Sequence, residues 1–189
     1  MKKLTVILFA LVPAFLLAQQ VVPSPPPKAA TAPEKINWVT IEQALELQKQ
    51  NPKKIMIDVY TKWCGPCKML SSTTFQSDDV ANYVNANFYA VKFDAESADA
   101  INYKGTTYSN PGYNPAATGR NSTHEFSRFL NVMAYPTIVV LDENGAYLNQ
   151  SRGLLNAGQL ECLLKYFQEG HFKSISWNDF QSTFTPSFK

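Results

Sequence analysis

The chain has 189 residues, with 17 Lys and Arg against 15 Asp and Glu, so its formal net charge at pH 7 is +2. So small an excess excludes a dominant phosphate-binding surface and with it a basic nucleic-acid-binding protein. A hydrophobic content of 45% excludes the disordered class and supplies material for a folded core. Three Cys are too few for a disulfide-stapled scaffold, so each is interpreted by its position.

The chain begins with a pattern that is typical of a secretory signal peptide over residues 1–18. Lys2 and Lys3 precede an apolar run from Leu4 to Ala18, and polar Gln19 follows at once. An uncleaved membrane tether is the alternative, but the run is shorter than the roughly 18 apolar residues of a spanning helix and contains a proline. We therefore expect a periplasmic or secreted protein.

Residues 19–35 follow as a proline-rich linker. They hold five prolines and no aromatic residue, which disfavours a helix and leaves no apolar face to bury. This composition predicts an extended tether to one domain over residues 36–170.

Apolar periods of two and of 3.6 residues alternate along this domain. They predict strands at residues 54–61, 89–93, 137–141 and 146–150. They also predict five helices, which begin after Thr40, at about Pro66, after Ser77, at a capping box formed by Ser122–Glu125 and at about Gln159. Asn144-Gly145 predicts a type I′ turn between the last two strands. We interpret the order as β-α-β-α-β-α-β-β-α, a three-layer α/β/α sandwich around a mixed sheet.

The most informative motif is Trp63-Cys64-Gly65-Pro66-Cys67-Lys68, where a buried strand gives way to a helix. Two thiols in C-x-x-C spacing can close a small disulfide ring, and the helix dipole stabilises a thiolate on the first one. An exposed Cys64 should attack a substrate disulfide, and Cys67 should resolve the mixed disulfide from the first helical turn. Half of a zinc site and a permanent structural disulfide are the alternatives.

The stretch from Asp58 to Gly158 resembles the thioredoxin family in this motif and in further positions. Asp58 and Lys92 match its buried acid and neighbouring lysine, Tyr135-Pro136-Thr137 matches its cis-proline loop, and Gly153 and Gly158 match its glycines before the last helix. Residues 74–96 resemble the branch that includes the C-terminal domain of the bacterial membrane thiol reductase. The resemblance implies a thioredoxin-like fold, with Trp63, Gly65, Pro66 and residues 135–137 contacting substrate and no cofactor beyond the dithiol.

Asp58 stands among apolar residues in mid-strand, where an unpaired charge would cost several kcal/mol. It should therefore be protonated or partnered. A structural ion pair or an edge exposure is one interpretation. The resemblance implies another, in which Asp58 relays the proton of Cys67 and Lys92 tunes it.

Three features depart from the family pattern. An insertion at about 97–121 should be disordered or functional; it could cover or shape the substrate groove, or be a plain surface insertion. The helix after it should present Phe126, Phe129 and Leu130 to the core. Tyr135 takes the place of a more usual aliphatic residue. In the tail at 171–189, a short helix capped by Ser176 should pack its aromatic side chains on the domain. We expect Cys162 to be a buried free thiol, and His124 and His171 to lie at the surface.

These features together predict a thiol-disulfide oxidoreductase that acts outside the cytoplasm, in the reducing direction, on disulfide-containing envelope or secreted proteins. A membrane thiol reductase is the expected electron donor, because an oxidising compartment does not keep the pair reduced. The remaining expectations are a monomer that binds no metal and no nucleic acid. The alternatives are an oxidase or isomerase and, from another class, a binding or chaperone module without turnover.

Overall fold

The computed structural model describes residues 34–189, so the predicted signal peptide and nearly all of the linker lie outside the described residues. Within that range, no helix is long and apolar enough to cross a membrane. In chain order the elements are β1 (Trp38–Val39), α1 (Ile41–Gln50), β2 (Lys54–Tyr60), α2 (Gly65–Ser72), the 3-10 turn η1 (Thr74–Gln76), α3 (Asp78–Asn87), β3 (Phe88–Asp94), β4 (Ile101–Tyr103), β5 (Thr106–Tyr108), α4 (Glu125–Phe129), β6 (Thr137–Leu141), β7 (Tyr147–Arg152), α5 (Ala157–Gln168), the 3-10 turn η2 (His171–Lys173) and α6 (Trp177–Thr183).

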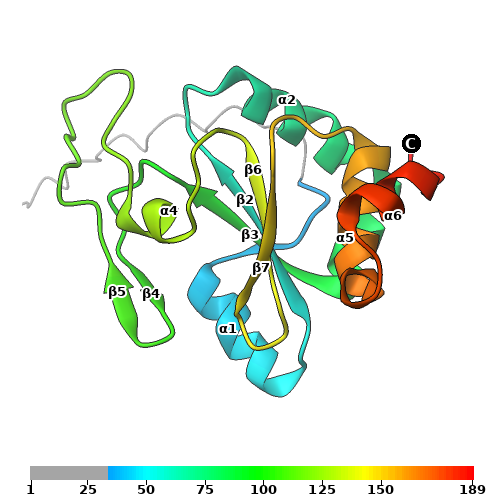
Figure 1. The fold of residues 1–189 in the computed structure, drawn as a ribbon. Helices are drawn as coiled ribbons and strands as arrows, with labels where there is room; N and C mark the ends of the chain where they lie inside the picture. The colour runs from blue at the N-terminus through cyan, green and yellow to red at the C-terminus, as the bar shows by residue number, and fades with distance from the viewer. Residues whose placement is uncertain (1–33) are drawn as a thin grey trace, which may run out of the picture. The chain divides into compact units, whose positions relative to one another are not determined.

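A five-stranded mixed sheet forms the centre of the domain, in the order β1-β3-β2-β6-β7 (Figure 1). β1 and β2 both run parallel to β3, whereas β6 runs antiparallel to β2 and to β7. The predicted α/β sandwich with a mixed sheet is confirmed. Because β2 and β3 are parallel neighbours, their carboxyl ends, Tyr60 and Asp94, meet at one edge of the sheet, where the Cys-x-x-C motif follows.

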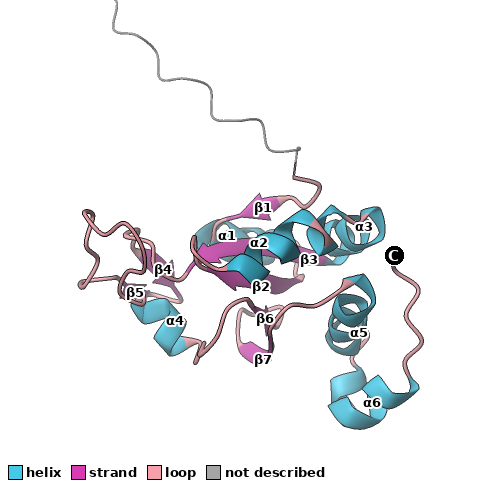
Figure 2. Cartoon of the chain, turned by 90° about the horizontal axis from the view of Figure 1, so that it is seen from above, coloured by secondary structure: helices cyan, strands magenta, loops and turns pink. Residues whose placement is uncertain are grey.

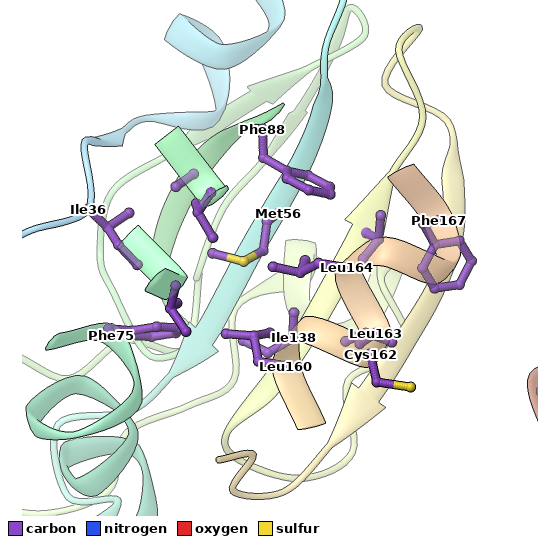
Figure 3. Close-up of a cluster of buried hydrophobic side chains, with 14 of the residues drawn as sticks. Ile36, Met56, Phe75, Phe88, Ile138, Leu160, Cys162, Leu163, Leu164 and Phe167 are labelled. Carbon is purple, nitrogen blue, oxygen red and sulfur yellow. The ribbon is translucent and has the colours of Figure 1, made fainter. Parts of the chain in front are cut away.

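Successive side chains of the buried strands point to opposite faces and build two separate cores. Met56 belongs to one core, with Ile138 and the apolar side of α5 (Figure 3). Ile55 and Ile57 belong to the other, with α1 and α4. Figure 2 shows the resulting layers, with α3 and α5 on one face of the sheet and α1 on the other. Asp58 has the same parity as Met56 and therefore faces the side that α2, α3 and α5 cover.

Three predicted helix starts are confirmed. The Thr40 hydroxyl accepts the Gln43 N–H at 3.2 Å while the Gln43 side chain accepts the Thr40 N–H at 2.9 Å, which makes a complete capping box. Ser77 caps α3, and Ser176 caps α6 by accepting the Asp179 N–H at 3.2 Å.

The predicted hairpin between β6 and β7 is present, but the type I′ turn is wrong. Among the residues of this turn, only Gly145 has a positive φ, at 71°, whereas a type I′ turn needs positive φ at Asn144 as well. The Asp142 carboxylate accepts the N–H groups of Asn144 and Ala146 at 2.8 and 2.7 Å. These hydrogen bonds from the backbone to the aspartate side chain favour a loop that is longer than a two-residue type I′ turn.

The start of α4 also differs from the prediction. Its N-cap is His124, whose Nδ1 accepts the Phe126 N–H at 3.0 Å, so the predicted capping box from Ser122 does not form. His124 is fully buried and not at the surface, because its Nε2 donates to the Asp99 carbonyl at 2.9 Å and its ring packs on Phe93. Phe126 and Leu130 reach the core as predicted, whereas Phe129 is 49% exposed.

The insertion is folded and begins with the β4–β5 hairpin, seen in green beside the main sheet (Figure 1). The buried Asn110 side chain closes its base by donating to the Ser97 and Ser122 carbonyls at 3.0 and 2.9 Å. The loop after β5 is therefore tied back to the end of β3. The insertion is thus an ordered part of the described structure.

The C-terminal tail packs on α5 as predicted, and a buried carboxylate anchors its end. Phe180 of α6 joins the core that contains α5. Glu161, fully buried in α5, accepts hydrogen bonds from the Ser187 N–H at 2.7 Å, the Phe188 N–H at 2.9 Å and the Lys165 ammonium at 2.8 Å. Burial alone would raise the pKa of Glu161, but these bonds lower it to about 2.

We expect Glu161→Gln to destabilise the protein by about 1–3 kcal/mol at pH 7, because an amide cannot accept every N–H that the carboxylate accepts. Because the folded pKa is depressed, this stabilisation is complete above the unfolded value near 4.5 and is lost as the pH falls toward about 2. Denaturant unfolding at pH 7 and at pH 3 measures the difference. Glu169→Gln, at the exposed end of the same helix, is the control. A Glu161→Gln effect that does not shrink in acid would contradict this assignment.

Candidate active site

Cys64 and Cys67 form a disulfide at the start of α2, with a Cα–Cα distance of 5.3 Å. Cys64 is the N-cap of this helix, and its Sγ accepts the Cys67 N–H at 3.1 Å. Pro66 occupies the first turn, where its missing N–H has no helical partner to lose. A backbone donor and the positive end of the helix dipole therefore both face the Cys64 sulfur.

The predicted exposure of Cys64 is wrong for the disulfide form. Both cysteines are only 3% exposed, because the Cys64 side chain folds back over the helix end to reach Cys67. What distinguishes the two sulfurs is the helix position, since Cys64 caps the N-terminus while Cys67 lies inside the first turn. The order of attack therefore rests on the hydrogen bond to the Cys64 sulfur and not on exposure.

An aromatic pair joins the motif to the loop before β6. The Tyr135–Pro136 peptide bond is cis, as the match to the cis-proline loop predicts. The Tyr135 ring meets the Trp63 ring edge-on, with centroids 6.0 Å apart, and Trp63 is 37% exposed. The Gly153 N–H donates to the Pro136 carbonyl at 2.8 Å, which ties the segment after β7 to the same loop.

The other residues predicted to contact substrate differ in their exposure to solvent. Gly65 and Pro66 are exposed on the outer surface of the motif, whereas Pro136 is buried. Thr137 is fully buried and its hydroxyl donates to the Ala134 carbonyl at 2.8 Å. The Thr137 side chain therefore cannot contact a substrate in this structure, and only its backbone could do so.

Asp58 is a fully buried carboxyl group in mid-β2, and neither of its oxygens has a hydrogen-bond partner within the described residues. Burial raises the pKa of Asp58 to about 7, the charge of Lys92 opposes this rise, and the charge of Glu34 reinforces it. A carboxyl group with this proton affinity can take up and release a proton near neutral pH. It lies on the face of the sheet that α2 covers.

Lys92 stands directly opposite Asp58 in the β2–β3 register, but its ammonium group binds elsewhere. Its Nζ lies 3.1 Å from the Glu34 carboxylate and 5.3 Å from the centre of the Trp38 ring. The structural pair between Asp58 and Lys92 is therefore absent as a direct ion pair in the described structure. Lys92 acts on Asp58 through its charge alone.

Two residues outside the predicted set contact the motif, Glu96 and Arg120. The Glu96 carboxylate accepts the Trp63 indole N–H, with both oxygens 3.0 Å from Nε1, and also accepts the Asn121 N–H at 2.9 Å. The Arg120 guanidinium lies 4.2 Å from the centre of the Trp63 ring. Glu96 follows β3 at the edge where the motif follows β2, and this shared edge is the signal that could have indicated it.

Cys162 is a buried free thiol, as predicted, and burial raises the pKa of that thiol. His171 is partly exposed and pairs with Glu169 at 3.1 Å. Among residues 34–189, no three His, Cys, Asp or Glu side chains gather as potential metal ligands.

Comparison with known proteins gives the family of this chain. The family model described as a thioredoxin-like domain matches residues 41–168. A thiol:disulfide interchange protein DsbD from Actinobacillus pleuropneumoniae is 29% identical over 125 residues, which cover 63% of this chain but only 18% of that protein. The chain thus spans about a fifth of the length of the curated relatives that it matches first.

Solved structures show the same fold. A thioredoxin-fold protein from Helicobacter pylori has a TM-score of 0.52 at 15% identity, covering 70% of this chain and 80% of its own. A structure described as DsbH oxidoreductase has a TM-score of 0.51 at 18% identity, covering 80% of this chain and 94% of its own. The chain belongs to the thioredoxin-like family and carries the Cys-x-x-Cys pair of a thiol:disulfide oxidoreductase.

Proposed function

We propose that the protein reduces disulfide bonds of polypeptides outside the cytoplasm, by exchange through the Cys64–Cys67 pair. The observation that carries this proposal is the Cys64–Cys67 disulfide at the start of α2, the helix that Cys64 caps. The contact between Trp63 and Tyr135 places this disulfide next to the cis-proline loop. Its relatives named as thiol:disulfide interchange proteins support the same chemistry.

The exchange proceeds in two substitutions at sulfur. The Cys64 thiolate attacks one sulfur of the substrate disulfide, and the other substrate sulfur leaves as a thiolate. Cys67 then loses its proton to Asp58 and attacks the Cys64 sulfur as a thiolate, which releases the second substrate sulfur as a thiolate. Two electrons have passed from the protein to the substrate, and the Cys64–Cys67 disulfide has closed.

A second reaction must restore the dithiol, because an oxidising compartment does not reduce it. We infer that the donor is a membrane thiol reductase, which would pass two electrons by the same exchange in reverse. The signal-peptide pattern at residues 1–18 and the likeness to DsbD support action at the cell envelope. The substrates would then be disulfide-containing envelope or secreted proteins. The protein would act on them as a monomer.

The direction of the exchange is tested by comparing the protein as a reductant of insulin with the protein as an oxidant of reduced ribonuclease. We expect the chemically reduced protein to cleave the interchain disulfides of insulin within minutes. The oxidised protein should be a poor oxidant of reduced ribonuclease. Turbidity measures the first reaction, and recovery of ribonuclease activity measures the second. Faster oxidation of ribonuclease than reduction of insulin would overturn the reducing direction in favour of an oxidase.

A further inference from the structure

The insertion is docked onto the active-site tryptophan by specific polar contacts. The Asn121 N–H donates to Glu96 at 2.9 Å, and the same carboxylate accepts the Trp63 indole N–H. The Asn121 side chain also exchanges two hydrogen bonds of 2.8 Å with the backbone of Asn114. The backbone on both sides of Arg120 is therefore held in a defined position next to the motif.

Arg120 covers one face of the Trp63 indole. Its guanidinium carbon lies 4.2 Å from the ring centre, and the ring itself is fixed by Glu96 at its N–H and by Tyr135 at its edge. A guanidinium held over an aromatic face keeps the N–H donors of its own edges free to bind a planar acceptor. The donors of Arg120 thus lie beside the residue that precedes Cys64.

Arg120 forms no direct ion pair within residues 34–189. No carboxylate lies within 4 Å of its guanidinium, and its side chain is exposed. Glu96, at the N–H edge of the Trp63 indole, uses its oxygens to accept the Trp63 and Asn121 N–H groups and does not pair directly with Arg120. Lys68 adds a further exposed positive charge just after Cys67. The guanidinium of Arg120 is therefore exposed beside the motif with no bound carboxylate.

We propose that Arg120 is a specificity-determining residue that binds a carboxylate side chain next to the disulfide of a polypeptide substrate. This inference rests on the proposed function and names the substrate class for the same site. A guanidinium fork binds a carboxylate in a bidentate manner, which gives orientation as well as attraction. Because the pair is exposed to solvent, we expect the preference for an acidic neighbour to be modest, about fivefold in rate.

The test uses the full chain in its chemically reduced form and two disulfide peptides that differ only in Glu or Gln beside the cysteine. The second-order rate constant of oxidation of the protein is measured with each peptide by Trp fluorescence or by mass. Wild type should react about fivefold faster with the Glu peptide, and high salt should reduce this ratio. In Arg120→Gln the ratio should fall to about one, and in Arg120→Lys it should be intermediate.

Arg128→Gln removes the same charge from an exposed position of α4 and is the matched control, which should keep the wild-type ratio. An Arg120→Gln protein with an unchanged preference would overturn the assignment, as would equal rates of wild type with both peptides. Failure of the proposed function gives a different result, because wild type would then reduce neither peptide.

Discussion

Cys67→Ser should accumulate as a covalent mixed disulfide with its substrates, whereas Cys64→Ser should trap few or none. The first cysteine attacks because the Cys67 N–H and the helix dipole stabilise its thiolate, and the second is needed to release the product. Removing Cys67 therefore stops the reaction after the first substitution. Removing Cys64 stops it before any substrate is bound, so both variants should lose essentially all turnover.

Non-reducing gels and mass spectrometry of the trapped adducts measure this difference. Cys162→Ser is the matched control, since that thiol is free and buried in α5 and should contribute nothing to trapping. Equal trapping by Cys64→Ser and Cys67→Ser would contradict the assignment of the nucleophile.

Asp58→Asn should stabilise the protein at neutral pH and slow the release of the mixed disulfide. Burial raises the pKa of Asp58 to about 7, so the folded state holds its proton more tightly than the unfolded state does. The wild type therefore loses stability as the pH rises from about 4 to about 7, and the asparagine variant avoids this loss. The shift corresponds to an upper limit of about 4 kcal/mol in favour of Asp58→Asn above pH 7.

The kinetic effect should fall on the second substitution, because Asp58 lies on the face of the sheet that α2 covers and can accept the proton of Cys67. A positioned general base typically contributes about 100-fold or more, so we expect resolution to slow by about that factor while the attack of Cys64 changes less. Single-turnover kinetics and denaturant unfolding from pH 4 to pH 8 measure both effects.

Asp99→Asn removes a carboxylate from an exposed position and serves as the control for both measurements. An Asp58→Asn variant destabilised by several kcal/mol with normal kinetics would contradict this account and would remove Asp58 from the proton relay.

The short motif and the strand pattern predicted most of what the backbone does at the site. Cys64 and Cys67 needed only their spacing at the end of a strand, because the chemistry of a dithiol ring is local. The cis Tyr135–Pro136 bond came from the family resemblance and is confirmed by the structure. Short apolar runs rich in β-branched residues located β2 and β6, because such runs are typical of strands covered on both faces.

The parts that were wrong or missed depend on contacts between distant segments. His124 appeared exposed at a helix start, but the insertion folds over it and supplies the Asp99 carbonyl. Glu96 and Arg120 reach Trp63 from a loop whose path no periodic pattern specifies. The turn at Asn144-Gly145 was misassigned because the Asp142 carboxylate competes for the same backbone N–H groups.

A contact between distant segments also explains why the sequence left two interpretations of Asp58 open, a structural partner of Lys92 or a proton relay. Burial was evident from its neighbours in the strand, but the partner of Lys92 was not, because Glu34 lies at the far end of the predicted linker. With Lys92 bound to Glu34, the carboxyl of Asp58 keeps no hydrogen-bond partner within the described residues. This arrangement holds the pKa of Asp58 near neutrality, so that its carboxylate can accept a proton from Cys67 and release it again.

The reduction potential of the Cys64–Cys67 pair tests the central claim most directly. Equilibration of the protein with glutathione buffers, followed by alkylation and mass spectrometry, gives the fraction of dithiol at each potential, and the constant label on Cys162 serves as an internal standard. We expect a reversible two-electron transition near the value of reducing thioredoxins, about −270 mV. A midpoint near about −120 mV, typical of a strong oxidant, or a pair that does not exchange with glutathione at all, would contradict a disulfide reductase.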